Sequence, residues 1–480
     1  MDISRYAAGA FAAATLLGAT GAHAQTAPAQ SASAQNTEDI TALRHDMEAL
    51  RQEYEARIAD LEARLARAEA AEGVQASAAP PDQTAATTTT PSDQTATADQ
   101  ATAPTTTPAA NDVYANASAP AGGQTSQSLY NPAMSVVLNG FLTAANRDTG
   151  SERIAGIASG GDIEHPPRGF SLGESEFGMS SNIDPYFYGF LVVALDNEGA
   201  ANVEEAYIQT TSMPGGLTLT AGRFFSGIGY ANETHAHNWA FSDAALPYRA
   251  FLGSQLGDDG VQLTWLAPTD QFLLFGVEAM RGAAYPAAGA RNNGIGSYAA
   301  WVRTGNDIDV SNSYLASVSY LHTQAADRVS DGDVFNGHDD LVIGSLTYKW
   351  APGGNRLNQN FTANGELFFG NENGTLNGIP VDQNRFGWYV QGIYQFMPRW
   401  RVGLRYAALH SDDPGPLLAG SALDDLGINP YTATALIEWD PSEFSRLRLQ
   451  YSHDESGFNP NDIVTMQYTA IYGMHGAHRY

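Results

Sequence analysis

The sequence predicts an all-β protein: a transmembrane antiparallel β-barrel of about 16 strands, preceded by a coiled-coil helix and a disordered linker. Between residues 134 and 474 the chain falls into about sixteen segments in which apolar and polar residues alternate. The gaps between these segments alternate between long and short. Nearly every segment has an apolar face, and no helical segments remain to cover those faces. A closed barrel in a membrane resolves this, because lipid covers its apolar outer face.

The first residues predict a secretory signal peptide, residues 1–24. Arg5 supplies a weak positive charge, residues 7–19 are largely apolar, and Ala22-His23-Ala24 matches the small-x-small cleavage pattern. No later stretch approaches the roughly 18 consecutive apolar residues of a membrane-spanning helix. An exported, membrane-bound chain with little helix indicates the outer membrane of a diderm bacterium, where it would contact outer-membrane lipid.

Composition restricts the chemistry of the chain. Its 480 residues contain no cysteine, which excludes disulfides, thiolate catalysis and cysteine metal sites. The formal net charge of -28 is spread over a sequence of which only 16% is charged, and this acidity argues against nucleic acid as a partner. Acidic external loops would instead suit divalent cations that bridge to lipopolysaccharide. No motif calls for a cofactor.

Two segments precede the expected barrel. Residues 37–72 predict a helix, because Ile40, Leu43 and Met47 begin a series of apolar residues spaced by three and four among Glu, Arg and Ala. This spacing favours a self-associating coiled coil over a lone amphipathic helix, and three helices would match a trimeric barrel. Residues 73–129 are rich in Ala, Thr, Pro and Gln and predict a disordered linker, since they contain too few apolar residues for a core.

The barrel is expected over residues 130–480. Its short connections hold the Pro, Gly, Asn and Asp of tight turns and would face the periplasm, as both termini of such barrels do. Counts of fourteen or eighteen strands stay open, because one hairpin is easily miscounted. The expected strands are residues 134–145, 171–181, 186–195, 202–212, 216–224, 259–267, 271–280, 296–304, 313–323, 338–349, 359–370, 384–396, 399–409, 430–440, 444–453 and 461–474.

Strand parity assigns side chains to the two faces of the wall. In residues 399–409, Trp400, Val402 and Leu404 alternate with arginines, so the apolar set would face lipid and the arginines the interior. An arginine on the lipid face near the bilayer midplane costs about 2–4 kcal/mol, which favours the inward placement. The same parity in neighbouring strands predicts a basic wall that lines a pore: Arg385, Arg399, Arg401, Arg405, Arg446 and Arg448.

The opposite side of the predicted barrel is acidic. Parity points Glu174 and Glu176 inward in one strand and Glu278 in another. Glu204 and Glu205 are adjacent, so only one can face inward in a regular strand, and we expect it to be Glu205. A water-filled lumen would hydrate these charges. The alternative is that they pair with one another and plug a narrow barrel.

The longest connection of the barrel, residues 225–258, is the third external loop. Together, strand number, loop order and charge layout make residues 130–480 resemble the 16-stranded general and substrate-selective porins of bacterial outer membranes. The resemblance implies passive diffusion of small hydrophilic solutes and ions through a barrel that this loop narrows, with no catalytic residues. It also implies that Glu233, Asp243, Asp258 and Asp259 supply the acidic side of the constriction.

The N-terminal helix resembles the coiled coil of phosphate-selective and sugar-specific porins, which are trimers. The resemblance implies a homotrimer. Because both termini of such barrels face the periplasm, we expect the helix and linker to lie there, and the helix-plus-linker layout motivates the hypothesis that the helix contacts peptidoglycan. Lys349 is the only lysine of the chain, which speaks against phosphate selectivity, because a strongly anion-selective pore would need an excess of lysines.

Glu233, His235 and His237 alternate within the third loop. In an extended segment they would share one face, a pattern typical of half a zinc site. An outer-membrane channel or receptor for zinc uptake is therefore the alternative function. The simpler interpretation is that these are ordinary polar loop residues.

Two further functional classes find little support. An active receptor would need a globular plug domain before a larger barrel, and the low-complexity linker cannot supply one. An outer-membrane enzyme would need a catalytic pair near the rim. His410-Ser411-Asp412 and His453-Asp454 lie at strand ends, but no nucleophile elbow surrounds them.

Overall fold

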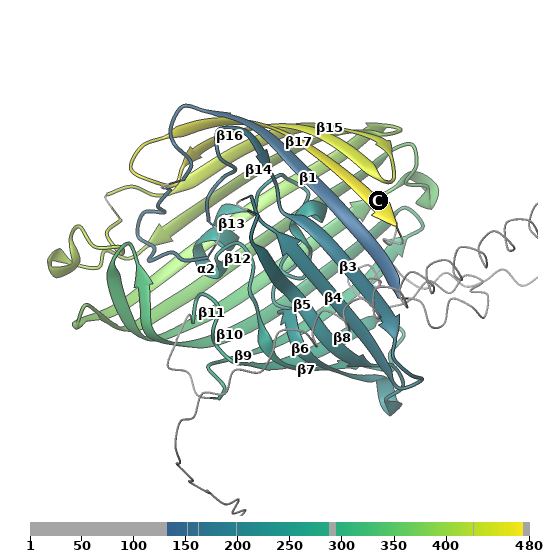
Figure 1. The fold of residues 1–480 in the computed structure, drawn as a ribbon, viewed down its shortest axis with the longest axis horizontal. Helices are drawn as coiled ribbons and strands as arrows, with labels where there is room; N and C mark the ends of the chain where they lie inside the picture. Colours follow the sequence, from purple (N-terminus) through teal and green to yellow (C-terminus); the bar gives the residue numbers. More distant parts are fainter. Residues whose placement is uncertain are drawn as a thin grey trace, which may run out of the picture. The chain divides into compact units, whose positions relative to one another are not determined.

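The computed structural model describes residues 132–473 except 151, 162, 198, 288–293 and 426. The predicted signal peptide, coiled-coil helix and linker, and residues 474–480, lie outside this described part. The described chain forms a closed antiparallel β-barrel (Figure 1). Among the described residues, no helix has both the length and the apolar character needed to cross a membrane.

Sixteen positions around the wall are filled by seventeen strand segments. β2 (Gly169–Leu172) and β3 (Ser175–Asn182) both pair with β1 (Ala133–Ala145) and together form one interrupted strand. Each later strand pairs with its neighbour in sequence, and β17 (Asn461–Gly473) pairs with β1 to close the barrel. The predicted number of sixteen is confirmed. The other strands are β4 (Phe187–Leu195), β5 (Ala201–Thr210), β6 (Leu217–Phe225), β7 (Gly257–Leu266), β8 (Phe272–Met280), β9 (Ser297–Asp309), β10 (Asn312–Ser330), β11 (Asp333–Trp350), β12 (Asn360–Leu376), β13 (Ile379–Met397), β14 (Trp400–Ser411), β15 (Tyr431–Ser442) and β16 (Ser445–Glu455).

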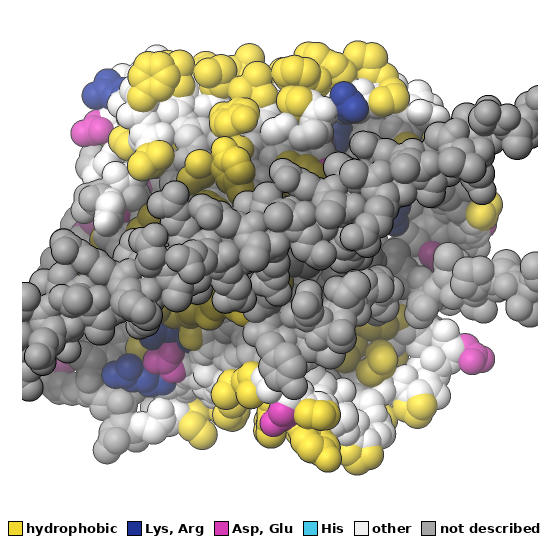
Figure 2. Space-filling view, turned by 45° about the vertical axis from the view of Figure 1, so that its right-hand side comes forward, with side chains coloured by type: hydrophobic (Ala, Val, Ile, Leu, Met, Phe, Trp, Pro, Cys, Tyr) yellow, Lys and Arg dark blue, Asp and Glu magenta, His cyan; other side chains and the backbone are white. Residues whose placement is uncertain are grey.

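The outer face of the wall is apolar. Val402, Leu404 and Tyr406 of β14 are exposed, whereas Arg405 and Ala407, which alternate with them, are buried. Leu404 is 69% exposed, so no second sheet within the described residues covers it. Figure 2 shows apolar side chains spread over the visible wall with few charged ones among them. This surface suits hydrocarbon, as the alternation predicts.

Two hairpins are longer than the sequence analysis predicts. The turn between β10 and β11 is Asp331-Gly332, and the turn between β12 and β13 is Asn377-Gly378. All four residues have positive φ, between 50° and 87°. Asp-Gly and Asn-Gly favour this geometry, which matches the twist of paired strands. The prediction of long external loops at these two places is therefore wrong, because the two strands of each hairpin stay paired up to the turn.

The connection between β6 and β7, residues 226–256, folds into the space that the wall encloses; we call it the internal loop. It contains η3 (Ala236–Asn238) and the helix α2 (Leu246–Leu252), which contacts β13 and β14 (Figure 1). Pro247 suits the first turn of α2, and Gly253 ends the helix in the left-handed conformation at φ 60°. The remaining short helical turns are η2 (Pro214–Gly216), η4 (Pro352–Gly354) and η5 (Pro416–Leu418).

The internal loop builds an apolar core inside the barrel. Leu246 and Phe251 of α2 pack with Ile154 and Ile157 of the connection after β1 and with inward-facing wall residues such as Phe368. Gly387 of β13 leaves room for the helix: a Cβ there would lie 2.9 Å from Phe251 and 3.2 Å from Pro247. Close packing of this kind fixes the loop against the wall.

Candidate functional site

The inward faces of β13, β14 and β16 carry most of the predicted basic wall. Arg385, Arg405, Arg446 and Arg448 are buried inside the barrel. Arg401 also faces inward, and its side chain stays 15% exposed. Strand register supports these assignments, since Arg448 lies directly opposite Glu438 of β15 and Arg401 lies opposite the same residue from the other side.

Arg399 does not belong to this wall. β14 begins at Trp400, so Arg399 lies in the turn after β13, with a φ of 71°. Its side chain is exposed, and its carbonyl oxygen accepts a hydrogen bond from the Asp440 amide at 2.9 Å. The predicted inward placement of Arg399 is wrong because the turn takes the residue out of the strand alternation.

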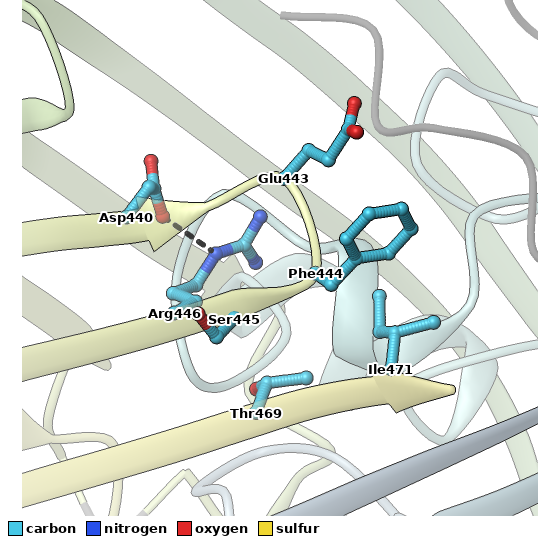
Figure 3. Close-up of a pocket in the computed structure, with 7 residues that line it drawn as sticks. All are labelled: Asp440, Glu443, Phe444, Ser445, Arg446, Thr469 and Ile471. Atoms are coloured by element: carbon cyan, nitrogen blue, oxygen red, sulfur yellow. Dashed lines mark ion pairs between the residues drawn. The ribbon is translucent and has the colours of Figure 1, made fainter. Parts of the chain in front are cut away.

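Carboxylates of the same wall neutralise the arginines near the short turns. Arg448 Nη2 lies 2.6 Å from Glu438 Oε2, and Arg401 contacts both Glu438 and Asp440. Figure 3 shows Arg446 beside Asp440, where Arg446 Nε and Asp440 Oδ1 are 3.6 Å apart. These three arginines thus share two carboxylates.

A small pocket that is open to solvent lies at the turn between β15 and β16 (Figure 3). Its lining mixes two carboxylates and an arginine with apolar side chains, so Arg446 belongs both to this pocket and to the charged cluster. The lining residues are Asp440, Glu443, Phe444, Ser445, Arg446, Thr469 and Ile471.

A second paired cluster lies on β10 to β13. Arg385 contacts Asp339 of β11, and its Nη1 lies 3.1 Å from Glu372 Oε2 of β12. Arg328 of β10 also contacts Glu372, and all four residues are buried. Arg328 is not among the predicted pore residues, because the strand expected from the sequence ends at residue 323. Charges inside the described barrel are therefore paired locally as well as across it, as the pairing alternative foresees.

The internal loop is tied to the wall through its own charges. Asp243 Oδ2 lies 2.7 Å from Arg405 Nη2, and Gln450 Nε2 donates to Asp243 Oδ1 at 2.6 Å. Glu233 Oε2 lies 2.6 Å from Arg303 Nη1 of β9. Asp243 and Glu233 therefore sit in the loop facing wall arginines, although Arg303 is not one of the arginines that the sequence analysis named.

His165, from the connection after β1, joins the same network. Its Nδ1 lies 2.7 Å from Glu152 Oε2 and its Nε2 lies 3.5 Å from Asp243 Oδ2. Burial and Arg249 lower the pKa of His165, but the hydrogen bonds to Asp243 and Glu152 outweigh them and raise it to about 9. Burial alone would raise the pKa of Asp243, yet Arg405 and His165 hold it well below its usual range.

Asp258 and Asp259 belong to β7 rather than to the loop, because the strand begins at Gly257. Asp258 is buried and accepts hydrogen bonds from the amides of Gly282 at 2.7 Å and Ala283 at 2.9 Å. Asp259 is 41% exposed and pairs with Arg223 Nε at 2.8 Å. The expectation that both face the arginine wall is wrong.

Glu278 of β8 is buried at the start of the internal loop. Its carboxylate accepts hydrogen bonds from Ser226 Oγ at 2.5 Å, the Gly227 amide at 2.8 Å and Trp301 Nε1 at 2.9 Å. The Glu278 side chain points into the barrel, as predicted. Its oxygens are engaged in holding the loop rather than in lining open space.

Glu176 and Glu205 face inward as predicted, and they meet the histidines of the internal loop. His235 Nε2 lies 2.9 Å from Glu205 Oε2, and His237 Nδ1 lies 2.5 Å from Glu176 Oε1. Glu204 also reaches His235, with its Oε2 3.2 Å from Nδ1. Both adjacent glutamates face inward because the register between β4 and β5 shifts at this point. The structure thus brings His235 and His237 together with wall carboxylates and places Glu233 elsewhere.

Inward side chains nearer the short turns are less tightly packed than those around the internal loop. Ser313, Lys349, Thr362 and Gln391 are only partly buried.

His410, Ser411 and Asp412 form no catalytic arrangement. His410 is exposed and forms a hydrogen bond with Asn429, whereas Ser411 is buried on the opposite face of β14.

Comparison of the sequence with known protein families matches residues 173–474 to a family described as "Putative beta-barrel porin-2, OmpL-like". An uncharacterized protein of Aquifex aeolicus (strain VF5) is 28% identical over 337 residues, which are 65% of this chain and 70% of that protein.

Several solved structures resemble this chain at low sequence identity. An anion-selective porin from Comamonas acidovorans is 10% identical with a TM-score of 0.46, over 71% of this chain and 99% of that one. Salmonella typhi OmpF in complex with daunomycin is 14% identical with a TM-score of 0.46, over 73% and 100% of the two chains. Pseudomonas putida OprB is 12% identical with a TM-score of 0.46, over 72% and 95%.

Proposed function

Because this chain belongs to the OmpL-like β-barrel porin family, we propose that it is an outer-membrane porin through which small hydrophilic solutes and ions diffuse passively. The observation that carries the proposal is the two-faced wall. Sixteen strand positions close into a ring, with apolar side chains outside and charged side chains inside. Charged and polar side chains on the inner face of the wall support a lumen that water and polar solutes reach.

The internal loop sets the aperture in this proposal. Support comes from its contacts: it reaches β9 through Glu233, β14 and β16 through Asp243, and β3 and β5 through His235 and His237. We infer that a segment held at so many points would leave only narrow paths beside it. Such paths would be lined by paired arginines and carboxylates, so ions of either sign could pass and selectivity would be weak.

Planar-bilayer recording of the purified full-length protein tests this function. We expect discrete conductance steps in potassium chloride, and larger steps when residues 240–253, which include α2, are replaced by a short Gly-Ser linker. Matched preparations of the two proteins must both show β-sheet circular dichroism and heat-modifiable migration on gels. Bilayers that stay silent with both folded proteins would refute the porin proposal, whereas equal steps would refute the role of the loop alone.

Assembly and location of the N-terminal segments follow from the same proposal. We infer a homotrimer in contact with outer-membrane lipid and lipopolysaccharide, whose helix at residues 37–72 lies in the periplasm against peptidoglycan. The support is the apolar spacing of that helix and its separation from the barrel by a low-complexity linker. A monomeric mass in detergent would refute the trimer, and failure of the chain to sediment with cell-wall sacculi would refute the peptidoglycan contact.

A further inference from the structure

We propose that His235, Glu176 and Glu204 bind one divalent transition-metal ion, with Zn²⁺ as the best match, and that this ion fastens the internal loop to the barrel wall. One ligand comes from the loop and two come from separate wall strands. The role is structural: the ion would hold the loop in place, and it is not the transported solute. The proposal therefore does not depend on the porin function.

The three ligands converge although they are far apart in sequence. Glu176 lies on β3, Glu204 on β5, and His235 just before η3 in the internal loop. One nitrogen and two carboxylate oxygens from these residues all lie within 4.8 Å of one another. Glu204 joins the group because the register shift between β4 and β5 turns it inward together with Glu205. Histidine nitrogen and carboxylate oxygen are both zinc ligands.

The spacing of the donor atoms fits a shared ion better than hydrogen bonds. His235 Nδ1 lies 3.3 Å from Glu176 Oε2 and 3.2 Å from Glu204 Oε2. Charge-assisted hydrogen bonds between nitrogen and carboxylate are about 2.7–2.9 Å long, and one N–H cannot point at both oxygens. Two ligands bound to one tetrahedral zinc at about 2.0–2.1 Å lie roughly 3.3 Å apart.

The neighbours of these residues have the arrangement of an outer coordination shell. Glu205 Oε2 lies 2.9 Å from His235 Nε2, so with the ion bound the ring would donate its Nε2 proton to Glu205 and leave the Nδ1 lone pair for the ion. His237 Nδ1 lies 2.5 Å from Glu176 Oε1, the oxygen that does not face His235. A metal-binding histidine usually donates its second ring nitrogen to a carboxylate in this way.

Charge gives an independent reason to expect a cation. Glu176, Glu204 and Glu205 all contact His235, and Glu176 also contacts His237, so even two imidazolium rings would neutralise only two of the three carboxylates. Among the described residues, Glu204 and Glu205 form ion pairs with His235 and with no arginine. In contrast, three arginines surround Glu438. Burying unbalanced charge is costly, and a divalent ion would remove most of the imbalance.

Glu174 offers a further oxygen beside this group. It precedes β3 by one residue, and its Oε1 is buried without a hydrogen-bond partner among the described residues. It is the natural candidate for a fourth ligand. The proposed site differs from the alternating Glu233, His235 and His237 of the sequence analysis, because Glu233 pairs with Arg303 and His237 supports Glu176.

Zinc binding by the full-length protein in detergent tests the proposal. After EDTA treatment and dialysis, we expect titration with ZnCl₂ to give one bound Zn²⁺ per chain. His235→Ala and Glu204→Gln should each lower the affinity at least a hundredfold. Glu205→Gln removes only the outer-shell partner and should lower the affinity by about 10–100-fold.

The matched control is His453→Ala. His453 also has carboxylates close by, with Asp462 Oδ1 at 2.8 Å and Glu455 Oε1 at 3.2 Å, but it is partly exposed and remote from the loop. It should bind zinc like the wild type. Zinc-edge absorption spectroscopy on the wild type needs no folded variant and should show nitrogen and oxygen ligands at about 2.0–2.1 Å. No stoichiometric zinc in the wild type, or equal affinity in His235→Ala and His453→Ala, would overturn the site.

Discussion

At the scale of single residues, buried ion pairs decide whether the internal loop stays against the wall. Asp243 is the clearest case, because Arg405, Gln450 and His165 all converge on its carboxylate. Removing one member of a buried pair leaves the other without a partner, which costs far more than the pair contributes at a surface. Removing a carboxylate from an ion pair is therefore expected to destabilise the protein more when the pair is buried inside the barrel than when it is exposed on the surface.

Asp243→Asn should destabilise the loop by about 3–5 kcal/mol, because Arg405 stays buried without its carboxylate. Asp259→Asn is the matched control, since Asp259 and Arg223 are each 41% exposed and such pairs contribute about 0–1 kcal/mol. Thermal unfolding in detergent measures the stability, and bilayer recording measures loop opening as current noise. Equal behaviour of the two variants would contradict the anchoring role of Asp243.

His165 should make the stability depend on pH. Its pKa in the folded protein is about 9, above the ordinary 6.5, because Asp243 and Glu152 favour its charged form over the opposing effects of burial and Arg249. Asp454 also faces it, with Oδ2 3.8 Å from Nε2. The stabilisation is present in full below pH 6.5 and is lost as the pH rises through 9. It amounts to on the order of 3 kcal/mol.

Melting temperatures of the wild type and His165→Gln at pH 6 and pH 10 check this dependence. The wild type should be the more stable protein at pH 6, and the difference should largely vanish at pH 10. A difference that grows with pH would show that the sign is wrong.

At the scale of strands and loops, the free-energy cost of introducing a charged side chain depends on whether its position faces lipid or water. Leu404 is 69% exposed in the middle of β14 and faces lipid, whereas Leu417 in η5 is 78% exposed in an external connection. The two leucines are thus similar in exposure and different in surroundings.

Leu404→Arg should destabilise the barrel by about 2–4 kcal/mol, because the guanidinium must leave water for the hydrocarbon region. Leu417→Arg should change the stability by less than about 0.5 kcal/mol, since water already surrounds that side chain. Urea titration of folding into lipid vesicles measures both values. Identical unfolding curves for the two variants would mean that β14 does not face the bilayer.

Strand alternation predicted the wall from sequence because it is a local signal with a period of two residues. It placed Arg405 and Arg448 inside and Leu404 outside, as the structure does. Asn377-Gly378 carried a hairpin signal that the sequence analysis did not use. The inward turn of Glu204 and the packing of Phe251 against Phe368 had no such local signal. Both depend on contacts between residues that are distant in sequence, so the interior of the barrel was less predictable than its wall.

At the scale of the whole molecule, the wall of the barrel has an apolar outer face and encloses both an apolar core and paired charges. The chain has a net charge of -28, yet the buried arginines of the lumen each have carboxylate partners. Selectivity therefore depends on small local imbalances rather than on the total charge. Arg401 matters most here, because it is the most exposed of the inward-facing arginines of β13, β14 and β16.

Arg401→Glu should shift ion selectivity toward cations, because it replaces a positive charge beside Glu438 and Asp440 with a third negative one. Arg399→Glu makes the same change of charge two residues earlier, in the exposed turn outside the strand, and should shift selectivity much less. Reversal potentials across a potassium chloride gradient in planar bilayers measure both variants. Equal shifts would mean that charge at the rim, and not the inward face of β14, governs which ions pass.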